Sequence, residues 1–168
     1  TNEKEDYVEP EGFNTPIFTD SNEGYQTYEM GNAIVYRDVS LIQAAQITGF
    51  DVVREPSFIP SDNPNHIREA VVGDGLISVD TIYDNFSVIQ VKGSIQQTWR
   101  VGPQAQVFDV VVNGEPASYI TQIDWTNSGN LSFNVLLWEE GDYTFSIRSS
   151  HLNETDLVAI ADSMYLED

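Results

Sequence analysis

The chain has 168 residues, which suits one domain with a sizeable hydrophobic core. Its 27 Asp and Glu residues face only 7 Lys and Arg, and the formal net charge of −20 argues against nucleic acid and anionic lipid surfaces as partners. No cysteine is present, which rules out disulfides, thiolate metal sites and cysteine nucleophiles. The acidity best fits a role in solubility, with divalent cations or a basic partner as alternatives.

Residues 1–24 predict a flexible acidic tether ahead of a single domain at residues 25–168. The segment carries seven acidic residues, one lysine, two prolines and two glycines, without apolar periodicity. Such a chain extends through self-repulsion, which suits a spacer between a domain and an anchor. The sequence shows neither a signal peptide nor an apolar run of membrane-spanning length. Membrane association is therefore expected only through an anchor upstream of residue 1.

Residues 40–49 predict the first helix. Ser40 can cap its start, Gln43 completes a capping box, and Gly49 marks its end. The predicted apolar face contains two alanines, so this helix is expected to pack closely against a sheet.

An extended, ordered loop is predicted at residues 51–66. Three prolines in this segment exclude a helix, because each removes a backbone donor and restricts the residue before it. Phe58 and Ile59 are expected to pin the loop to the core through their side chains.

After residue 67 the hydrophobic period changes to two, which indicates β-strands. The separators are short and rich in Asn, Gly, Asp and Ser, which favour turns. Short separators also favour antiparallel neighbours, since a parallel crossover needs about a dozen residues. We therefore predict an antiparallel meander of six to seven strands. The segments with the clearest pattern are 76–83, 86–92, 106–112, 117–124, 131–138 and 143–149.

A second helix is predicted at the end of the sequence. Asn153 is a good N-cap, Glu154 and Asp156 place negative charge in the first turn, and Leu152 is spaced to pack as a hydrophobic staple. An apolar stripe follows at helical spacing and is expected to lie against the sheet. The stripe consists of Leu157, Ile160, Ala161 and Met164.

Four motifs in order resemble those of an uncharacterised bacterial domain family. Val112–Ala117 has the sequence VNGEPA, and Trp138 with Tyr143 resembles the family's paired-strand motif. Upstream, Ala44–Pro60 is similar to the family's helix and its proline-bracketed segment, with Ile59 where Leu is common. The terminal helix matches at Leu157, Ile160, Ala161 and Ser163, with Asp156 in place of Glu. The resemblance spans about residues 38–165, although the strands between 66 and 106 diverge too far to be matched.

This resemblance implies a non-enzymatic module outside the cytoplasm. The family occurs in extracytoplasmic parts of membrane-anchored, anti-sigma-factor-like proteins and in lipoproteins. The resemblance also implies a relation to the half-barrels of periplasmic lipoprotein carriers and envelope-stress regulators. The implied role is that of an anchored sensor, regulator or lipoprotein that binds a protein or a hydrophobic, lipid-like ligand.

A serine hydrolase is a weak alternative. Ser150, His151 and Asp156 supply the residue types of a triad, but consecutive strand residues point apart and no nucleophile elbow is present. His66 lies in the proline-rich loop without a second histidine nearby, which argues against zinc. Among 27 carboxylates, some acidic pairs are expected by chance at the separation found in glycosidases. Such pairs are therefore no evidence for glycan hydrolysis. Residues 124–130 lack the acidic pattern of a calcium loop.

A carbohydrate-binding module is the main alternative function. Trp99, Trp125 and Trp138 could stack on sugars if their rings are exposed, although aromatic residues in strands more often belong to the core. Coplanar exposed rings would favour sugar binding, whereas an apolar concavity between sheet and helix would favour a carrier.

Together these patterns predict an α+β domain, with a curved antiparallel sheet packed by two helices, one of them C-terminal. We expect no catalytic residue, cofactor or metal, and the ligand-binding residues are not identified by any motif.

Overall fold

The computed structural model describes residues 18–73, 75–93, 100–101, 105–124 and 132–166. It is an α+β domain built on one open antiparallel sheet of 11 strands with two helices. The predicted fold class is thus confirmed. The elements are β1 (Thr19–Asp20), β2 (Gln26–Met30), β3 (Ala33–Arg37), α1 (Leu41–Thr48), β4 (Ile67–Gly73), β5 (Leu76–Ile82), β6 (Ser87–Lys92), β7 (Arg100–Val101), β8 (Val107–Val112), β9 (Glu115–Asp124), β10 (Ser132–Glu140), β11 (Tyr143–Ser149) and α2 (Glu154–Ser163).

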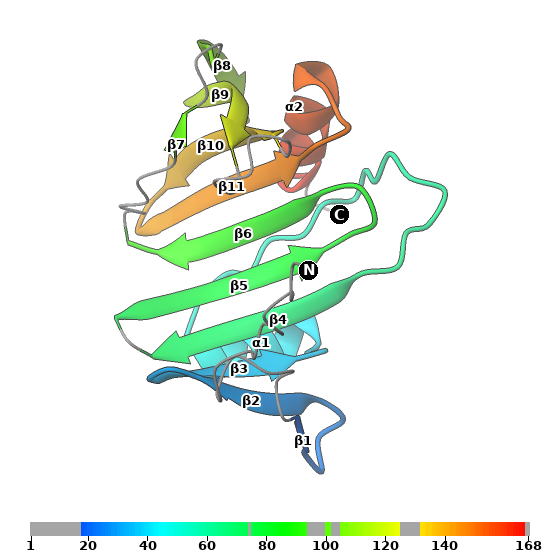
Figure 1. Cartoon of the computed structure of the whole chain (residues 1–168), viewed down its shortest axis with the longest axis vertical. Helices are drawn as coiled ribbons and strands as arrows, with labels where there is room; N and C mark the ends of the chain where they lie inside the picture. The colour runs from blue at the N-terminus through cyan, green and yellow to red at the C-terminus, as the bar shows by residue number, and fades with distance from the viewer. Residues whose placement is uncertain (1–17, 74, 94–99, 102–104, 125–131, 167–168) are drawn as a thin grey trace, which may run out of the picture.

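The strand order departs from the predicted meander of six to seven strands. The order is β1-β2-β3-β4-β5-β6-β11-β10-β9-β7, and β8 pairs with β9 (Figure 1). The first six strands follow the chain, but β6 pairs with β11 instead of the next strand in sequence. Adjacent strands are only about 4.8 Å apart, so the chain after β6 can reach the far edge of the sheet. It then returns toward β6 through β9, β10 and β11. The short turn sequences predicted the hairpins, but no local sequence pattern predicted this longer connection.

The N-terminal part of the sheet lies ahead of the first predicted strand. β2 and β3 form a hairpin, β3 pairs with β4, and β1 pairs with β2 through Thr19 and Asp20. The sheet therefore begins before residue 25, where the compact domain was expected to start. Residues 1–17 of the expected tether lie outside the described residues.

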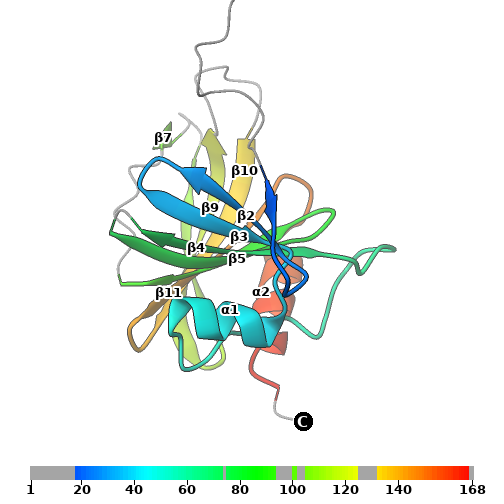
Figure 2. The ribbon, with the colours of Figure 1, turned by 90° about the horizontal axis from the view of Figure 1, so that it is seen from below.

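Both helices lie on the same face of the sheet, which we call the covered face (Figures 1 and 2). α1 packs against β4 and β5, and α2 packs against β8 and β10. The opposite face carries no helix of the described chain and is called the open face. Alternate residues of every strand therefore point into a helix-covered core or away from it.

Helix α1 has the boundaries that its caps predict. The Ser40 side chain accepts a hydrogen bond from the Gln43 amide at 3.1 Å, and the Gln43 side chain accepts one from the Ser40 amide at 2.9 Å. At the other end Gly49 adopts a φ of 75°, a left-handed conformation that glycine enters without steric cost.

Helix α2 buries the stripe predicted from its spacing. Asn153 caps it by accepting a hydrogen bond from the Asp156 amide at 3.0 Å. Burying each large apolar side chain contributes roughly 1.5–3 kcal/mol, so this stripe is a major source of stability. Its buried residues are Leu157, Ile160, Ala161 and Met164, which join the main core with Phe145, Ile147 and Trp138.

The proline-rich loop is pinned through Ile59 and through its backbone, but not through Phe58. Ile59 is partly buried and packs against the core as predicted, whereas the Phe58 side chain is 44% exposed, contrary to expectation. Instead, the amides of Ser57 and Phe58 both donate to the Ser163 hydroxyl, each at 3.1 Å, while that hydroxyl donates to the Ile160 carbonyl at 2.6 Å. The loop has no sheet partner for these amides, so a side chain of α2 satisfies them.

Candidate functional site

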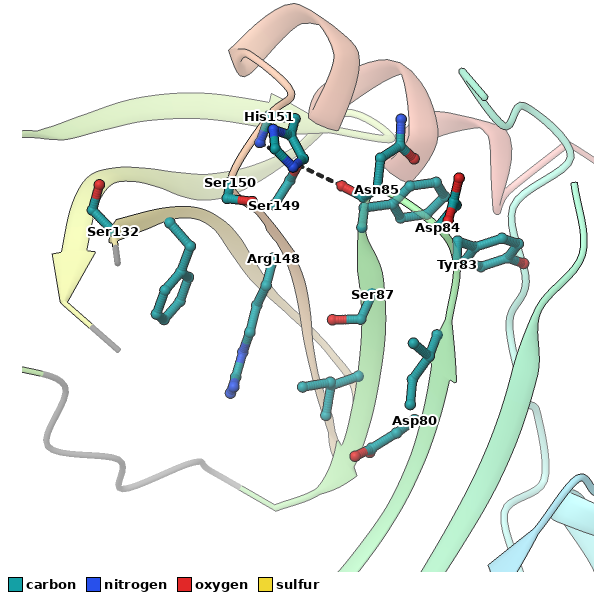
Figure 3. A pocket seen from close by; sticks show the side chains of 14 residues that line it. Asp80, Tyr83, Asp84, Asn85, Ser87, Ser132, Arg148, Ser149, Ser150 and His151 are labelled. Carbon is teal, nitrogen blue, oxygen red and sulfur yellow. Dashed lines mark hydrogen bonds between the residues drawn. The ribbon is translucent and has the colours of Figure 1, made fainter. Parts of the chain in front are cut away.

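A cavity of about 480 Å³ opens on the open face of the sheet (Figure 3). Ile82 of β5, Ile89 of β6 and Phe133 of β10 provide apolar surface, and Asp80 and Arg148 provide charge. The strand pairs explain how these residues meet, since Asp80 stands opposite Ile89 in the ladder. Its size falls within the range of small-molecule sites. The concavity lies opposite the helices, so it is not the cavity beneath a helix that would favour a carrier.

Two chain turns form the rim of the cavity and are tied together. The rim consists of the β5–β6 turn at residues 83–86 and the entry to α2 at residues 149–151. The Ser149 hydroxyl donates to the Asn85 carbonyl at 2.7 Å and accepts from the His151 amide at 3.1 Å. The Asn85 side chain in turn donates to the Pro60 carbonyl at 2.9 Å. These bonds hold the rim rigid, which lowers the entropy lost on binding.

Charged side chains run across the open face next to the cavity. Arg37, Glu69 and Asp80 stand opposite one another on β3, β4 and β5. Arg37 donates to Glu69 at 2.8 Å, so Glu69 is neutralised by its own partner. Figure 3 shows the Arg148 side chain extending from β11 on the same side of the sheet as Asp80.

Asp80 has the most perturbed carboxyl group of the open face. Burial raises the pKa of Asp80 to about 6, with a further increase from nearby Glu69, against the lowering effects of a Ser78 hydrogen bond and of Arg148. Its Oδ1 atom is inaccessible to solvent and has no hydrogen-bond partner in the described part of the chain. An unsatisfied buried polar atom costs about 1–3 kcal/mol, and such atoms are rare in folded proteins. Because Asp80 also lines the cavity, a rotation of its side chain would present this unsatisfied acceptor to a ligand.

Arg148 gives the cavity its cationic side. Burial lowers the pKa of Arg148 from its ordinary value, while the charge of Asp80 raises it. The guanidinium group lies 5.9 Å from the centre of the Phe133 ring, within the range of a cation–π interaction. An apolar ring and a charged group thus share one wall of the cavity.

A second, more polar cavity of about 410 Å³ lies at the other end of β10. Arg54 and Glu140 form a two-pronged ion pair there, with Nη2 to Oε1 at 2.6 Å and Nε to Oε2 at 2.9 Å. The Trp138 indole donates to the Tyr165 hydroxyl at 2.8 Å, and burial raises the pKa of Tyr165 to about 12. These groups satisfy one another, so this cavity is part of the structure that joins the loop, β10 and the C-terminal residues.

The three residues considered as a triad are not assembled into one. Ser150 and His151 lie on the cavity rim with exposed side chains. Asp156 is in the first turn of α2, where its amide donates to Asn153. The rim bonds that position this segment come from Ser149, which sequence reasoning did not select. A hydroxyl before a helix start is a common backbone partner, and that signal could have identified it.

The other sequence candidates are dispersed. The exposed His66 immediately precedes β4, and its ring centre lies 5.2 Å from the ring centre of Tyr83. Trp138 is buried and stacks on Phe145 at 5.3 Å, so it presents no ring to a sugar. Trp99 and Trp125 lie outside the described residues, as does all of segment 124–130 except the strand position of residue 124. Within the described ranges no group of three His, Asp or Glu residues is placed to hold a metal ion.

Several residues of the motifs that resemble the bacterial family have structural roles, in hydrogen bonds and a turn. Tyr143 accepts from the Asp51 amide at 3.1 Å and also donates to the Asp51 carboxylate, whose pKa this bond lowers. VNGEPA forms the turn between β8 and β9, with Asn113 at a φ of 49° and Gly114 at 79°. Trp138 and Ser163 also form hydrogen bonds between separate segments, since Trp138 donates to Tyr165 and Ser163 accepts from the amides of the proline-rich loop.

A family model described as a domain of unknown function, DUF4367, matches residues 74–164. The match covers more than half of the chain and runs from β5 to the end of α2, so it includes every residue that lines the open-face cavity. No curated protein and no solved structure matches the chain. Among the described helices, none has the length and apolar character required to cross a membrane.

Proposed function

This chain belongs to the DUF4367 family, a domain of unknown function, and we propose that it is a non-catalytic binding domain for an amphipathic ligand. The ligand would lie in the cavity of the open face. The observation that carries this proposal is a rigid-rimmed cavity with apolar walls, in which the buried Oδ1 atom of Asp80 has no partner among the described residues.

The lining indicates the ligand's chemistry. An apolar body would contact Ile82, Ile89 and Phe133. A polar head with a hydrogen-bond donor would satisfy Asp80, and a head group that also accepts would reach Arg148. Few polar groups in an otherwise apolar pocket are the usual means of fixing a ligand's orientation.

We also propose that the domain works outside the cytoplasm, in the cell envelope or as a secreted module. The resemblance to domains of anchored, anti-sigma-factor-like proteins and lipoproteins supports this location, as does the spacer-like composition of residues 1–24. In that setting ligand occupancy would be reported by a membrane- or lipid-anchored sensor, regulator or lipoprotein. Protease treatment of intact bacteria that carry the gene tests the location. Cleavage of the domain without lysis is expected, and protection until lysis would contradict it.

The binding proposal is tested with decyl maltoside below its micelle concentration, with maltose as the comparison. This pair separates an apolar tail from a sugar, and isothermal titration with the full chain measures both. We expect saturable binding of decyl maltoside and none of maltose. Equal binding of both would instead favour the carbohydrate-binding alternative, and binding of neither would contradict the proposed ligand class.

A matched pair of variants locates the binding. Ile82→Asn changes a cavity residue that is 42% exposed, and Ile34→Asn makes the same change at a residue of β3 that is 40% exposed and lies outside the cavity. Because both side chains are already partly in water, both variants should fold. Decyl maltoside binding should weaken by about tenfold in Ile82→Asn, which corresponds to about 1.4 kcal/mol, and should not change in Ile34→Asn. Equal effects would place the binding elsewhere.

A further inference from the structure

The outer edge of β8 is an unpaired strand edge with exposed apolar side chains. β8 pairs with β9 along residues 107–112, and in the described chain no strand lies on its other side (Figure 1). Val107 is 64% exposed and Val111 is 58% exposed. A long, apolar edge strand of this kind is a template for pairing with another chain.

The register shows which backbone groups are free. β8 and β9 are joined by the two-residue turn Asn113–Gly114, so the flanking residues Val112 and Glu115 form a hydrogen-bonded pair. Bonded and non-bonded pairs then alternate along an antiparallel ladder. The amides and carbonyls of Val107, Asp109 and Val111 therefore point away from β9, to the outer edge.

The edge is held rigid by α2. The Asn113 amide donates to the Asp162 carboxylate at 2.9 Å, and α2 packs against the covered side of β8. The strand is thus already extended before a partner arrives, so little entropy is lost when one pairs with it.

The charge around this edge identifies the partner. Residues 101–124 contain no lysine or arginine, and Asp109 lies between Val107 and Val111 on one side of β8. Exposed Glu115 and Glu139 add to the same acidic region. A second copy of this chain would bring another charge of −20 and a second Asp109, which opposes pairing between copies.

We propose that β8 docks an extended, basic segment of another protein as an additional strand of the sheet. One side of that segment would present an apolar residue, a lysine or arginine, and an apolar residue at alternate positions. These would face Val107, Asp109 and Val111. Main-chain hydrogen bonds would supply affinity and the alternate side chains specificity.

The test uses the full chain and a synthetic seven-residue peptide, lysine-valine-threonine-lysine-threonine-valine-lysine, with blocked ends. Binding is followed by amide NMR shifts and by titration calorimetry. The expected result is saturable binding with shifts at Val107, Asp109 and Val111. A peptide with glutamate in place of lysine should not bind.

Two proline variants separate strand pairing from attraction between charges. Asp109→Pro removes an outward amide and a charge, and Glu29→Pro makes the same change on β2, next to the edge strand β1 at the opposite side of the sheet and beyond the two residue pairs that join β1 to β2. Since edge positions with outward amides tolerate proline, both should fold, which thermal denaturation checks. Peptide affinity should fall about tenfold in Asp109→Pro and stay within about twofold in Glu29→Pro. Asp109→Asn keeps the amide and should lose only about twofold to threefold.

Three outcomes would overturn the proposal. Equal losses in the two proline variants would mean that only net charge attracts the peptide. Shifts at residues of the open-face cavity instead of β8 would place the peptide at the other site. A dimer of the free chain that Asp109→Pro dissociates would make a second copy the occupant.

Discussion

Strand β11 shows how differently the two faces of this sheet are built. Phe145 and Ile147 point to the covered face and are fully buried against α2 and its neighbours, whereas Ser146 and Arg148 point to the open face. The contrast extends to hydrogen bonding. On the covered face the buried Gln90 side chain accepts from the Arg54 amide at 3.2 Å and donates to the Val52 carbonyl at 2.8 Å.

On the open face some buried polar groups are also bonded, as when the Thr144 hydroxyl donates to the Gly93 carbonyl at 2.7 Å, but two lack partners within the part of the chain that the structure describes. The Oδ1 atom of Asp80 and the Ser146 hydroxyl have none among the described residues. The difference teaches that the covered face carries the larger core, while the open face buries a smaller cluster of Ala33, Val35 and Val71 and leaves these polar atoms unsatisfied beside a cavity. Substitutions in the covered-face core and substitutions of these unsatisfied polar groups should therefore have opposite consequences.

The largest effect is expected from Phe145→Ala on the covered face. Removing a fully buried aromatic side chain should lower the free energy of unfolding by about 3–5 kcal/mol. Ser146→Ala, one residue away on the open face, removes an unpartnered hydroxyl and should change it by less than about 1 kcal/mol, in the stabilising direction. Urea denaturation measures both. A loss under about 1 kcal/mol for Phe145→Ala would contradict the division between the faces.

A smaller loss is expected from Ser163→Ala. This change leaves the amides of Ser57 and Phe58 without their acceptor, and orphaned backbone donors should cost about 2–4 kcal/mol in total. Ser150→Ala, at an exposed serine of the cavity rim, is the matched control and should stay within about 0.5 kcal/mol. Chemical denaturation of the two variants gives the comparison, and equal values would show that Ser163 does not hold the loop.

In contrast, Asp80→Asn should raise the free energy of unfolding at neutral pH. The folded pKa of about 6 lies above the ordinary aspartate value of 3.8, so the folded state holds this proton more tightly. The associated stability is fully present below pH 3.8 and is lost as pH rises through 6. Ionised Asp80 therefore costs on the order of 1–3 kcal/mol at pH 7, and the asparagine variant should be more stable by that order.

The measurement is the difference in unfolding free energy between wild type and Asp80→Asn from pH 4 to pH 8. It should grow with pH, mainly between pH 4 and 6. Asp51→Asn on the other face is the contrasting variant, because the Tyr143 hydrogen bond lowers the pKa of Asp51. The stability that ionised Asp51 contributes is present at neutral pH and is lost as pH falls. Asp51→Asn should therefore be less stable than wild type at pH 7. Parallel curves for wild type and Asp80→Asn would contradict a raised pKa.

Local chemistry made the helices predictable from sequence. Ser40, Gln43 and Asn153 cap α1 and α2 as their side chains dictate, and the stripe of α2 is buried. The turns between later strands were also predictable, because Gly and Asn mark them. A similar signal, Gly31–Asn32 between apolar residues, marked the β2–β3 hairpin but was not used.

The cavity could not be predicted in the same way. Asp80, Ile89, Arg148 and Phe133 come from four strands, and they meet only because β6 pairs with β11. That pairing depends on a long connection whose path no local pattern specifies. The environment of Asp80 also depends on Glu69 of β4, a strand that lay outside the predicted set. Sequence periodicity assigned the faces of single strands, but not which strands share a site.

The most direct test of the division between the faces is methyl NMR of the full chain during titration with decyl maltoside below its micelle concentration. The account predicts saturable shifts of the Ile82 and Ile89 methyl groups, with those of Leu157 and Ile160 unchanged. Shifts concentrated at Leu157 and Ile160 would place the ligand between sheet and helix, and would contradict a binding site on the open face.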